Sequence, residues 1–216
     1  MAFAGFPENV FDIFELPGYA ARMPRLRAEI TPRLKELGAV LGARLETVFG
    51  IPMHPHVALH MRRTVNPPEE TWVAFCRETR AYKPYVHFRA ALNKNGMKFA
   101  CFLEDDADDK AAFAGGLTRN ASALLKSFKA NNGIYSYDLI DSEGCPRLAS
   151  SLTRGEVEAF ADRLARVKSQ HASFGIPVDR LSPSLRTADG VLRLAEESFR
   201  ALMPLYDLGM KPGLRL

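Results

Sequence analysis

The chain lacks the features that mark exported, membrane-spanning and disulfide-bonded proteins. Its three cysteines lie far apart in a sequence of 216 residues and include no CxxC pair, which favours a reducing compartment. The N-terminal stretch carries acids and has no basic opening before an apolar core, so we expect no signal peptide. No apolar run reaches the roughly 20 residues that cross a bilayer. The sequence therefore predicts a soluble cytoplasmic protein.

Motifs of several large enzyme classes are also missing. There is no GxxxxGK[ST], no GxGxxG after a predicted strand, no GxSxG and no HExxH, which excludes the usual P-loop, Rossmann, α/β-hydrolase and zincin signatures. The excess of one charge sign is also small, because 29 lysines and arginines against 25 acids leave a net charge of +4. That balance permits a nucleotide or nucleic-acid partner without requiring one.

What the chain does have is 47% apolar residues, enough for a sizeable core in a chain of one-domain length. Apolar residues at helical spacing predict helices, one of which begins at a Thr31 N-cap followed by Pro32. The expected helices cover residues 19–30, 32–49, 110–130, 154–167 and 189–206, and the expected strands cover 54–62, 72–76, 85–92, 97–103, 134–140 and 174–178. We therefore expect one α+β domain over residues 1–216, a mostly antiparallel sheet with helices packed on one side.

Residues suited to chemistry gather between His54 and Leu92. This stretch holds four of the five histidines, the only tryptophan and six arginines or lysines. Histidines alternate with aliphatic residues from His54 to Arg62, so a strand there puts histidines on one face and Val57, Leu59 and Met61 on the other. We expect an antiparallel meander, turned at Asn93–Gly96, with one apolar face and one face of histidine, arginine and lysine.

Short motifs in the first half of the chain resemble a known family. They are FDxF from Phe11, PHVAxHxRRxVNPP from Pro55, TWVAF from Thr71, RxYK from Arg80 and HF from His87. Together they resemble the YktB-like family of uncharacterised bacterial proteins, most specifically between Phe11 and Leu92. The resemblance implies a soluble cytoplasmic protein with a two-layer architecture similar to the core of biotin-protein ligases and class II aminoacyl-tRNA synthetases. It implies no activity.

The leading hypothesis is a site for an anionic small molecule on the polar face. Arginine forks and a lysine suit phosphate or carboxylate, and histidines near neutral pKa suit proton transfer. The candidate catalytic residues are His56, His60 and His87. The candidate ligand-binding residues are Arg62, Arg63, Asn66, Trp72, Arg80, Tyr82, Lys83 and Arg89. Whether the site also catalyses a reaction stays open, and the sequence identifies no cofactor.

Two alternatives use the same face. His54, His56 and His60 resemble the paired imidazoles of sheet metal sites, with His87 as a further ligand, but no complete ligand spacing is present, so we assign no metal. Arginine, lysine, tyrosine and tryptophan on an open sheet also suit stacking with bases. The competing class is therefore a non-enzymatic module that binds nucleic acid or protein.

Overall fold

The computed structural model describes residues 3–210. The helices in this part of the chain are α1 (Gly18–Arg25), α2 (Thr31–Phe49), α3 (Lys110–Ala130), α4 (Arg154–Arg166) and α5 (Ala188–Tyr206). The strands are β1 (His54–Val57), β2 (Glu70–Cys76), β3 (His87–Asn93), β4 (Gly96–Leu103), β5 (Tyr135–Ile140), β6 (Pro146–Leu148) and β7 (Ala172–Asp179). Among residues 3–210, no helix has the length and apolar composition that a bilayer crossing requires.

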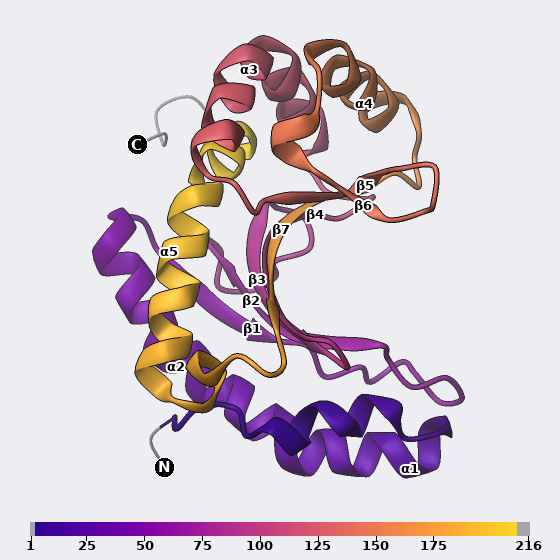
Figure 1. Cartoon of the computed structure of the whole chain (residues 1–216), viewed down its shortest axis with the longest axis vertical. Coiled ribbons are helices and arrows are strands. Elements are labelled where there is room, and N and C mark those ends of the chain that lie inside the picture. The colour runs from indigo at the N-terminus through magenta and orange to yellow at the C-terminus, as the bar shows by residue number, and fades with distance from the viewer. Residues whose placement is uncertain (1–2, 211–216) are drawn as a thin grey trace. The chain divides into compact units, whose positions relative to one another are not determined.

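The strands form one sheet in the order β1-β2-β3-β4-β7-β5-β6, and β1/β2, β5/β6 and β5/β7 pair antiparallel (Figure 1). This confirms the α+β class with a mostly antiparallel sheet. The likeness to biotin-protein ligases stays a prediction.

The described chain groups into two compact units. Unit 1 comprises residues 3–79, 89–99 and 177–197, and unit 2 comprises residues 80–88, 100–176 and 198–210. The chain passes from one unit to the other within β3, β4, β7 and α5. A single-domain organisation stays a prediction, and each unit is described by itself.

In unit 1, α2 packs against β1 and β2 (Figure 1). The leucine stripe on this helix is fully buried at Leu34, Leu37, Leu41 and Leu45. Helix and strand approach closely at Gly38, where an added Cβ would lie 2.9 Å from the Cβ of Pro55. The prediction of an amphipathic core helix over this segment is confirmed, and the helix fixes one face of β1 and β2 against the core.

The predicted N-cap at Thr31 is wrong, because the chain is helical on both sides of it. Between α1 and α2 a π-helical turn spans Leu26–Ile30, and the Thr31 hydroxyl donates to the carbonyl of Leu26 at 3.3 Å. Pro32 has no N–H, and its ring crowds the preceding turn. A single turn inside a helix is the form in which π-helix mostly occurs.

The predicted strand over 54–62 is wrong beyond Val57. The last ladder bond runs from the Ala58 N–H to the Trp72 carbonyl at 2.9 Å. The register would next pair Leu59 with Thr71 and His60 with Glu70, but His60 has a left-handed backbone, at φ +49°, which does not continue a strand. The chain turns away instead, which leaves the expected core residues Leu59 and Met61 47% and 79% exposed.

The hairpin between β3 and β4 is confirmed, with Lys94 and Asn95 as its turn. Gly96 begins β4 at φ +135°, and an added Cβ there would lie 2.2 Å from the carbonyl oxygen of Val178 in β7. Only glycine combines this backbone angle with such a close approach. The hairpin turn is therefore held closely against the end of β7 in unit 1, where the Arg180 N–H also donates to the Asn95 carbonyl at 2.9 Å.

In unit 2, α3 covers the predicted range and packs against α4 (Figure 1). Its apolar stripe is buried at Phe113, Leu117, Ala121, Leu124 and Phe128. At the start of α4, Thr153 and Glu156 form a capping box, in which each side chain accepts the backbone N–H of the other residue. In unit 2, α3 therefore has its predicted bounds, and α4 begins as predicted and ends one residue earlier, at Arg166.

Candidate functional site

Three predicted site residues of unit 1 lie together and are called here the His60–Trp72–Arg89 cluster. The guanidinium carbon of Arg89 lies 4.4 Å from the centroid of the Trp72 ring. The His60 ring meets the same indole edge-on, with centroids 5.4 Å apart. Arg89 is 4% exposed and Trp72 is half-buried. The spacing predicts that Arg89 lies on the polar face of the sheet, and there Trp72 shields its guanidinium, because the two side chains stack.

The backbone φ angle and the pKa of His60 are both unusual. It is the only non-glycine residue with positive φ among residues 3–210, at +49°. Its Nε2 lies 3.0 Å from the Thr71 hydroxyl. Burial lowers the pKa of His60 to about 4, with a further lowering from the charge of Arg63 and an opposing effect of Glu70. The imidazole is therefore neutral at physiological pH and forms a hydrogen bond through Nε2.

The segment from Leu59 to Pro68 is called the basic loop and carries three more predicted site residues. Arg62, Arg63 and Asn66 are all exposed. The loop turns on a bond from the Arg63 N–H to the His60 carbonyl at 3.1 Å. A second, long contact of 3.5 Å joins the Arg63 guanidinium to the Asn66 carbonyl. The loop thus presents two guanidinium groups to solvent beside a neutral imidazole.

His56 lies on β1, opposite Ala74 of β2. Since Pro55 faces α2, the alternation of a strand places His56 on the opposite face of the sheet. Its Nε2 lies 2.8 Å from the carbonyl oxygen of Glu78 and donates to it. Nearby on the sheet, Lys98 of β4 and Glu70 of β2 form an ion pair at 3.3 Å. This side of unit 1 is therefore polar, as the sequence predicts.

The remaining predicted residues belong to unit 2. Arg80 and Lys83 are exposed, on the segment before β3, and Tyr82 is half-buried. The Tyr82 and His87 rings meet edge-on with centroids 4.8 Å apart. His87 is fully buried, and its Nδ1 lies 2.8 Å from the carbonyl oxygen of Tyr85. The spacing predicts that His87 lies on the polar face of its strand, but β3 is buried on both faces.

The predicted residues thus form two groups, one in each unit, and their union in a single site stays a prediction. So do the catalytic roles of His56, His60 and His87. Within residues 3–210, no three histidine, cysteine or acidic side chains gather closely enough to hold a metal ion. Cys76 and Cys101 are buried and form no disulfide, and burial raises the pKa of Cys101. Neither cysteine is poised as a nucleophile.

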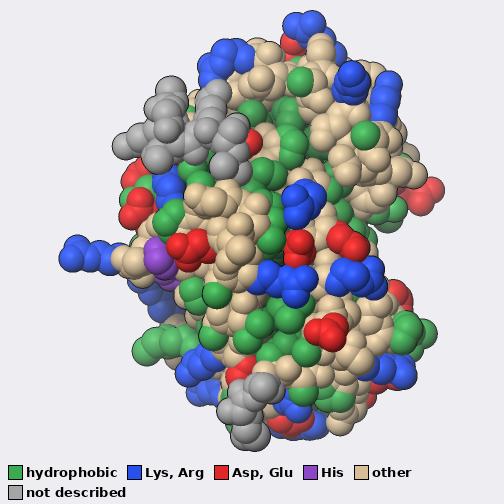
Figure 2. All heavy atoms as spheres, turned by 90° about the vertical axis from the view of Figure 1, so that its left-hand side faces the viewer, with side chains coloured by type: hydrophobic (Ala, Val, Ile, Leu, Met, Phe, Trp, Pro, Cys, Tyr) green, Lys and Arg blue, Asp and Glu red, His purple; other side chains and the backbone are tan. Residues whose placement is uncertain are grey.

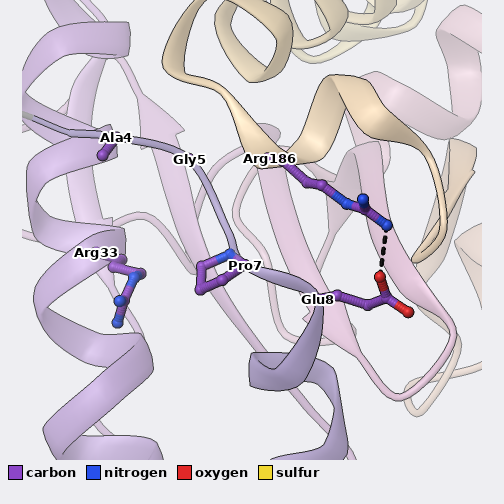
Figure 3. A pocket seen from close by; sticks show the side chains of 6 residues that line it. All are labelled: Ala4, Gly5, Pro7, Glu8, Arg33 and Arg186. Carbon is purple, nitrogen blue, oxygen red and sulfur yellow. Dashed lines mark hydrogen bonds and ion pairs between the residues drawn. The ribbon is translucent and has the colours of Figure 1, made fainter.

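Sequence reasoning missed two features of unit 1. Thr71 is fully buried and holds His60 through its hydroxyl, a contact that depends on the turn of the basic loop rather than on spacing. A pocket of about 470 Å³ lies between the N-terminal segment, α2 and the turn before α5. Figure 3 shows Arg186 directed at Glu8, with which it forms an ion pair, while Arg33 stands apart on α2. The lining residues are Ala4, Gly5, Pro7, Glu8, Arg33 and Arg186.

Fold and cluster together define an α+β protein with a polar sheet face and a basic loop. A family model described as "Domain of unknown function (DUF1054)" matches residues 6–206, and the chain belongs to this family. A UPF0637 protein of Listeria welshimeri is 41% identical over 216 residues, which cover 98% of this chain and 100% of the relative. A UPF0637 protein of Staphylococcus saprophyticus is 30% identical over 203 residues, covering 93% and 96%.

A third relative, a UPF0637 protein of Shouchella clausii, is 28% identical over 213 residues, which cover 99% of this chain and 98% of the relative. These matches confirm the YktB-like family predicted from the sequence. They also extend the relationship along nearly the whole chain, whereas the motifs pointed mainly to the part from Phe11 to Leu92.

Proposed function

We propose that this chain binds an anionic small molecule, bearing a phosphate or a carboxylate, at the His60–Trp72–Arg89 cluster and the adjoining basic loop. The observation that carries the proposal is the nearly buried guanidinium of Arg89 on the half-buried ring of Trp72. Removing a charge from water is costly, and a left-handed histidine adds roughly 1–3 kcal/mol of strain. Such costs concentrate at binding sites, where the surrounding structure sustains them.

The chemistry of the neighbouring groups supports an anion. Arg62 and Arg63 offer exposed forks that match two oxygens of a phosphate or carboxylate. His60 is neutral at physiological pH because its pKa lies near 4, so it offers a hydrogen bond without a second charge. Trp72 adds a planar surface on which a ring of the ligand can stack. The three free cysteines support a cytoplasmic location for this binding.

The second candidate is a module that binds nucleic acid or protein without catalysis. Met61 and Val65, 79% and 73% exposed on the basic loop, favour contact with another macromolecule. On the face that Figure 2 shows, however, lysine and arginine side chains are interspersed with acids. The net charge of the chain is only +4, which is modest for a protein that follows a phosphate backbone. The small-molecule proposal therefore ranks first.

Trp72 allows a direct test, because it is the only tryptophan of the chain. Its fluorescence is titrated with ATP, acetyl phosphate, citrate and a short single-stranded RNA at two salt concentrations. We expect one phosphate or carboxylate compound to change the emission saturably. We expect the dissociation constant to rise about tenfold or more in Arg63→Ala, since a lost charge-assisted hydrogen bond costs about 1.5–3 kcal/mol.

The matched control is Arg193→Ala, which removes an exposed arginine from α5, where it pairs with Glu197. This variant should bind like the unchanged protein. Binding of RNA alone, falling steeply with salt, would favour the second candidate. Emission that responds to none of the four compounds contradicts the proposal.

A further inference from the structure

A buried carboxylate holds the fifth histidine of the chain, in unit 2. Asp138 lies on β5 and His171 immediately precedes β7, and the two strands pair antiparallel with Ser136 opposite Phe174. The register brings the start of β7 beside Asp138. The His171 Nε2 lies 3.1 Å from Asp138 Oδ1, with the carboxyl side chain 3% exposed and the imidazole 48% exposed.

The Asp138 carboxylate is fixed from several directions. Its Oδ2 accepts the backbone N–H of Ser173 at 2.6 Å, and its Oδ1 accepts the Gln170 amide at 3.3 Å. The backbone is held as well, because Arg163 of α4 donates to the Asp138 carbonyl at 3.0 Å. A carboxylate bound in this way has little freedom to turn. It therefore orients the imidazole rather than following it.

The imidazole is also fixed in its plane. Its ring stacks on Phe102 of β4, with centroids 5.5 Å apart and planes 11° from parallel. Because Nε2 faces a carboxylate, the proton of the neutral ring resides on Nε2, and Nδ1 carries the lone pair. Within residues 3–210, no side chain or backbone group bonds to Nδ1 of His171. The ring thus combines a fixed orientation, a fixed tautomer and an unused basic nitrogen.

We propose that His171 and Asp138 form a general-base dyad, in which His171 Nδ1 takes a proton from an O–H or activated C–H group of a substrate and Asp138 is the positioning residue. The arrangement carries the inference: an exposed imidazole held by a buried carboxylate and stacked on an aromatic ring. Stacking alone would not require a buried carboxylate, which is costly to keep without a task. The proposal does not rest on ligand binding at the His60–Trp72–Arg89 cluster.

The chemistry balances without a cofactor. As Nδ1 forms its bond to the proton, the electron pair of the broken O–H or C–H bond moves into the substrate. The ring becomes an imidazolium, and Asp138 stabilises its charge through the Nε2 hydrogen bond. The proton then passes to the product or to water, which restores the neutral ring. General-base assistance of this kind contributes about 10²–10⁴ in rate.

The probe is 5-nitrobenzisoxazole, whose ring opens when a base removes its C3–H proton and the N–O bond breaks to give a cyanophenolate. It is aromatic, so it suits the neighbourhood of Phe102, and it reports proton abstraction by a simple change in absorbance. We expect the full chain to open it faster than buffer. We expect the rate to fall about tenfold or more in His171→Ala and to remain unchanged in His54→Ala, the matched control on β1.

Asp138→Asn tests the positioning role through the tautomer of His171, which a purely structural contact would not change. In the unchanged protein, ¹⁵N NMR of His171 should show a protonated Nε2 and a bare Nδ1, and Asp138→Asn should mix the two tautomers while the fold persists by circular dichroism. A rate that survives His171→Ala, a rate no faster than buffer, or a proton on Nδ1 in the unchanged protein would each overturn the proposal.

Discussion

The guanidinium of Arg89 lies 4.4 Å above the ring of Trp72, and both residues belong to strands that are neighbours in the sheet. A cation held over an indole face, largely away from water, interacts more strongly than the same pair at an exposed site. The stack therefore couples two central strands of unit 1 through their side chains as well as through their backbones. It also places the only tryptophan of the chain beside the predicted ligand residues.

This stack predicts a measurable coupling between the two residues. A double-mutant cycle with Trp72→Leu and Arg89→Met should give an interaction free energy of about 1–2 kcal/mol, because either substitution alone removes the cation–π contact. Urea unfolding of the four proteins, followed by circular dichroism, measures it. Additive effects of the two substitutions would contradict a specific contact between them.

His60 predicts how the stability of unit 1 depends on pH. Its pKa is lowered to about 4 in the folded chain, from an ordinary value of 6.5. Between these values the unfolded chain binds a proton that the folded chain does not, so stability rises with pH through this window and falls as pH drops from 6.5 towards 4. Since His60 is half-buried, solvent screening limits the effect to about 1 kcal/mol.

The measurement compares the free energy of unfolding at pH 7 and pH 4.5 for the unchanged chain and for His60→Asn. Asparagine tolerates positive φ, so this variant removes the titration and keeps the backbone turn. We expect a smaller loss of stability on acidification in His60→Asn than in the unchanged chain. His54→Asn, at the start of β1, is the control and should lose as much stability on acidification as the unchanged chain. Equal losses in all three proteins would refute the assignment to His60.

Much of the fold follows from local pattern, as α3 illustrates. Its range and its buried stripe from Phe113 to Phe128 could be predicted because every turn of a helix repeats the same face. The capping box of Thr153 and Glu156 could be predicted for a similar reason, since both partners lie within one turn. Interactions between residues that are a few positions apart can be recognised in the sequence.

The residues of the candidate site could be predicted from the sequence better than their positions and contacts could. Period-two spacing placed His60 on a strand, whereas its left-handed backbone ends that pattern and turns its ring towards Trp72. The burial of His87 and Arg89 depends on side chains from other segments, such as Tyr82 and Trp72, which spacing within β3 does not encode. The contact between Asp138 and His171 arises from the pairing of β5 with β7, two strands separated by α4.

The capping box of α4 predicts a further stability change. Thr153→Ala should lower the free energy of unfolding by about 1 kcal/mol, because the backbone N–H of Glu156 loses its acceptor. Thr153→Ser keeps a hydroxyl at the same position and should lie within a few tenths of a kcal/mol of the unchanged chain. Thermal unfolding of the two variants side by side provides the measurement. Equal midpoints for both would show that the hydroxyl does not stabilise the helix.

The adjacent glycines of α3 predict opposite outcomes for the same substitution. An added Cβ at Gly115 meets only the guanidinium end of Arg119, at 2.9 Å, which can move aside. An added Cβ at Gly116 meets the Cβ of Leu208 at 2.9 Å and its Cα at 3.4 Å, and these atoms are fixed by the short helical turn Asp207–Gly209. Gly116 therefore allows Leu208 to pack closely on α3, whereas the position of Gly115 has room for a methyl group once Arg119 moves.

Gly115→Ala should raise the free energy of unfolding by up to about 1 kcal/mol, because alanine favours the helix over glycine. Gly116→Ala gains the same helix propensity but must displace Leu208, so it should lower stability by about 1–3 kcal/mol. Urea unfolding followed by circular dichroism measures both. Because the substitutions are identical and neighbouring, any difference in sign reports the contact with Leu208 and not the helix itself. Stabilisation by both substitutions would mean that Leu208 does not pack on α3.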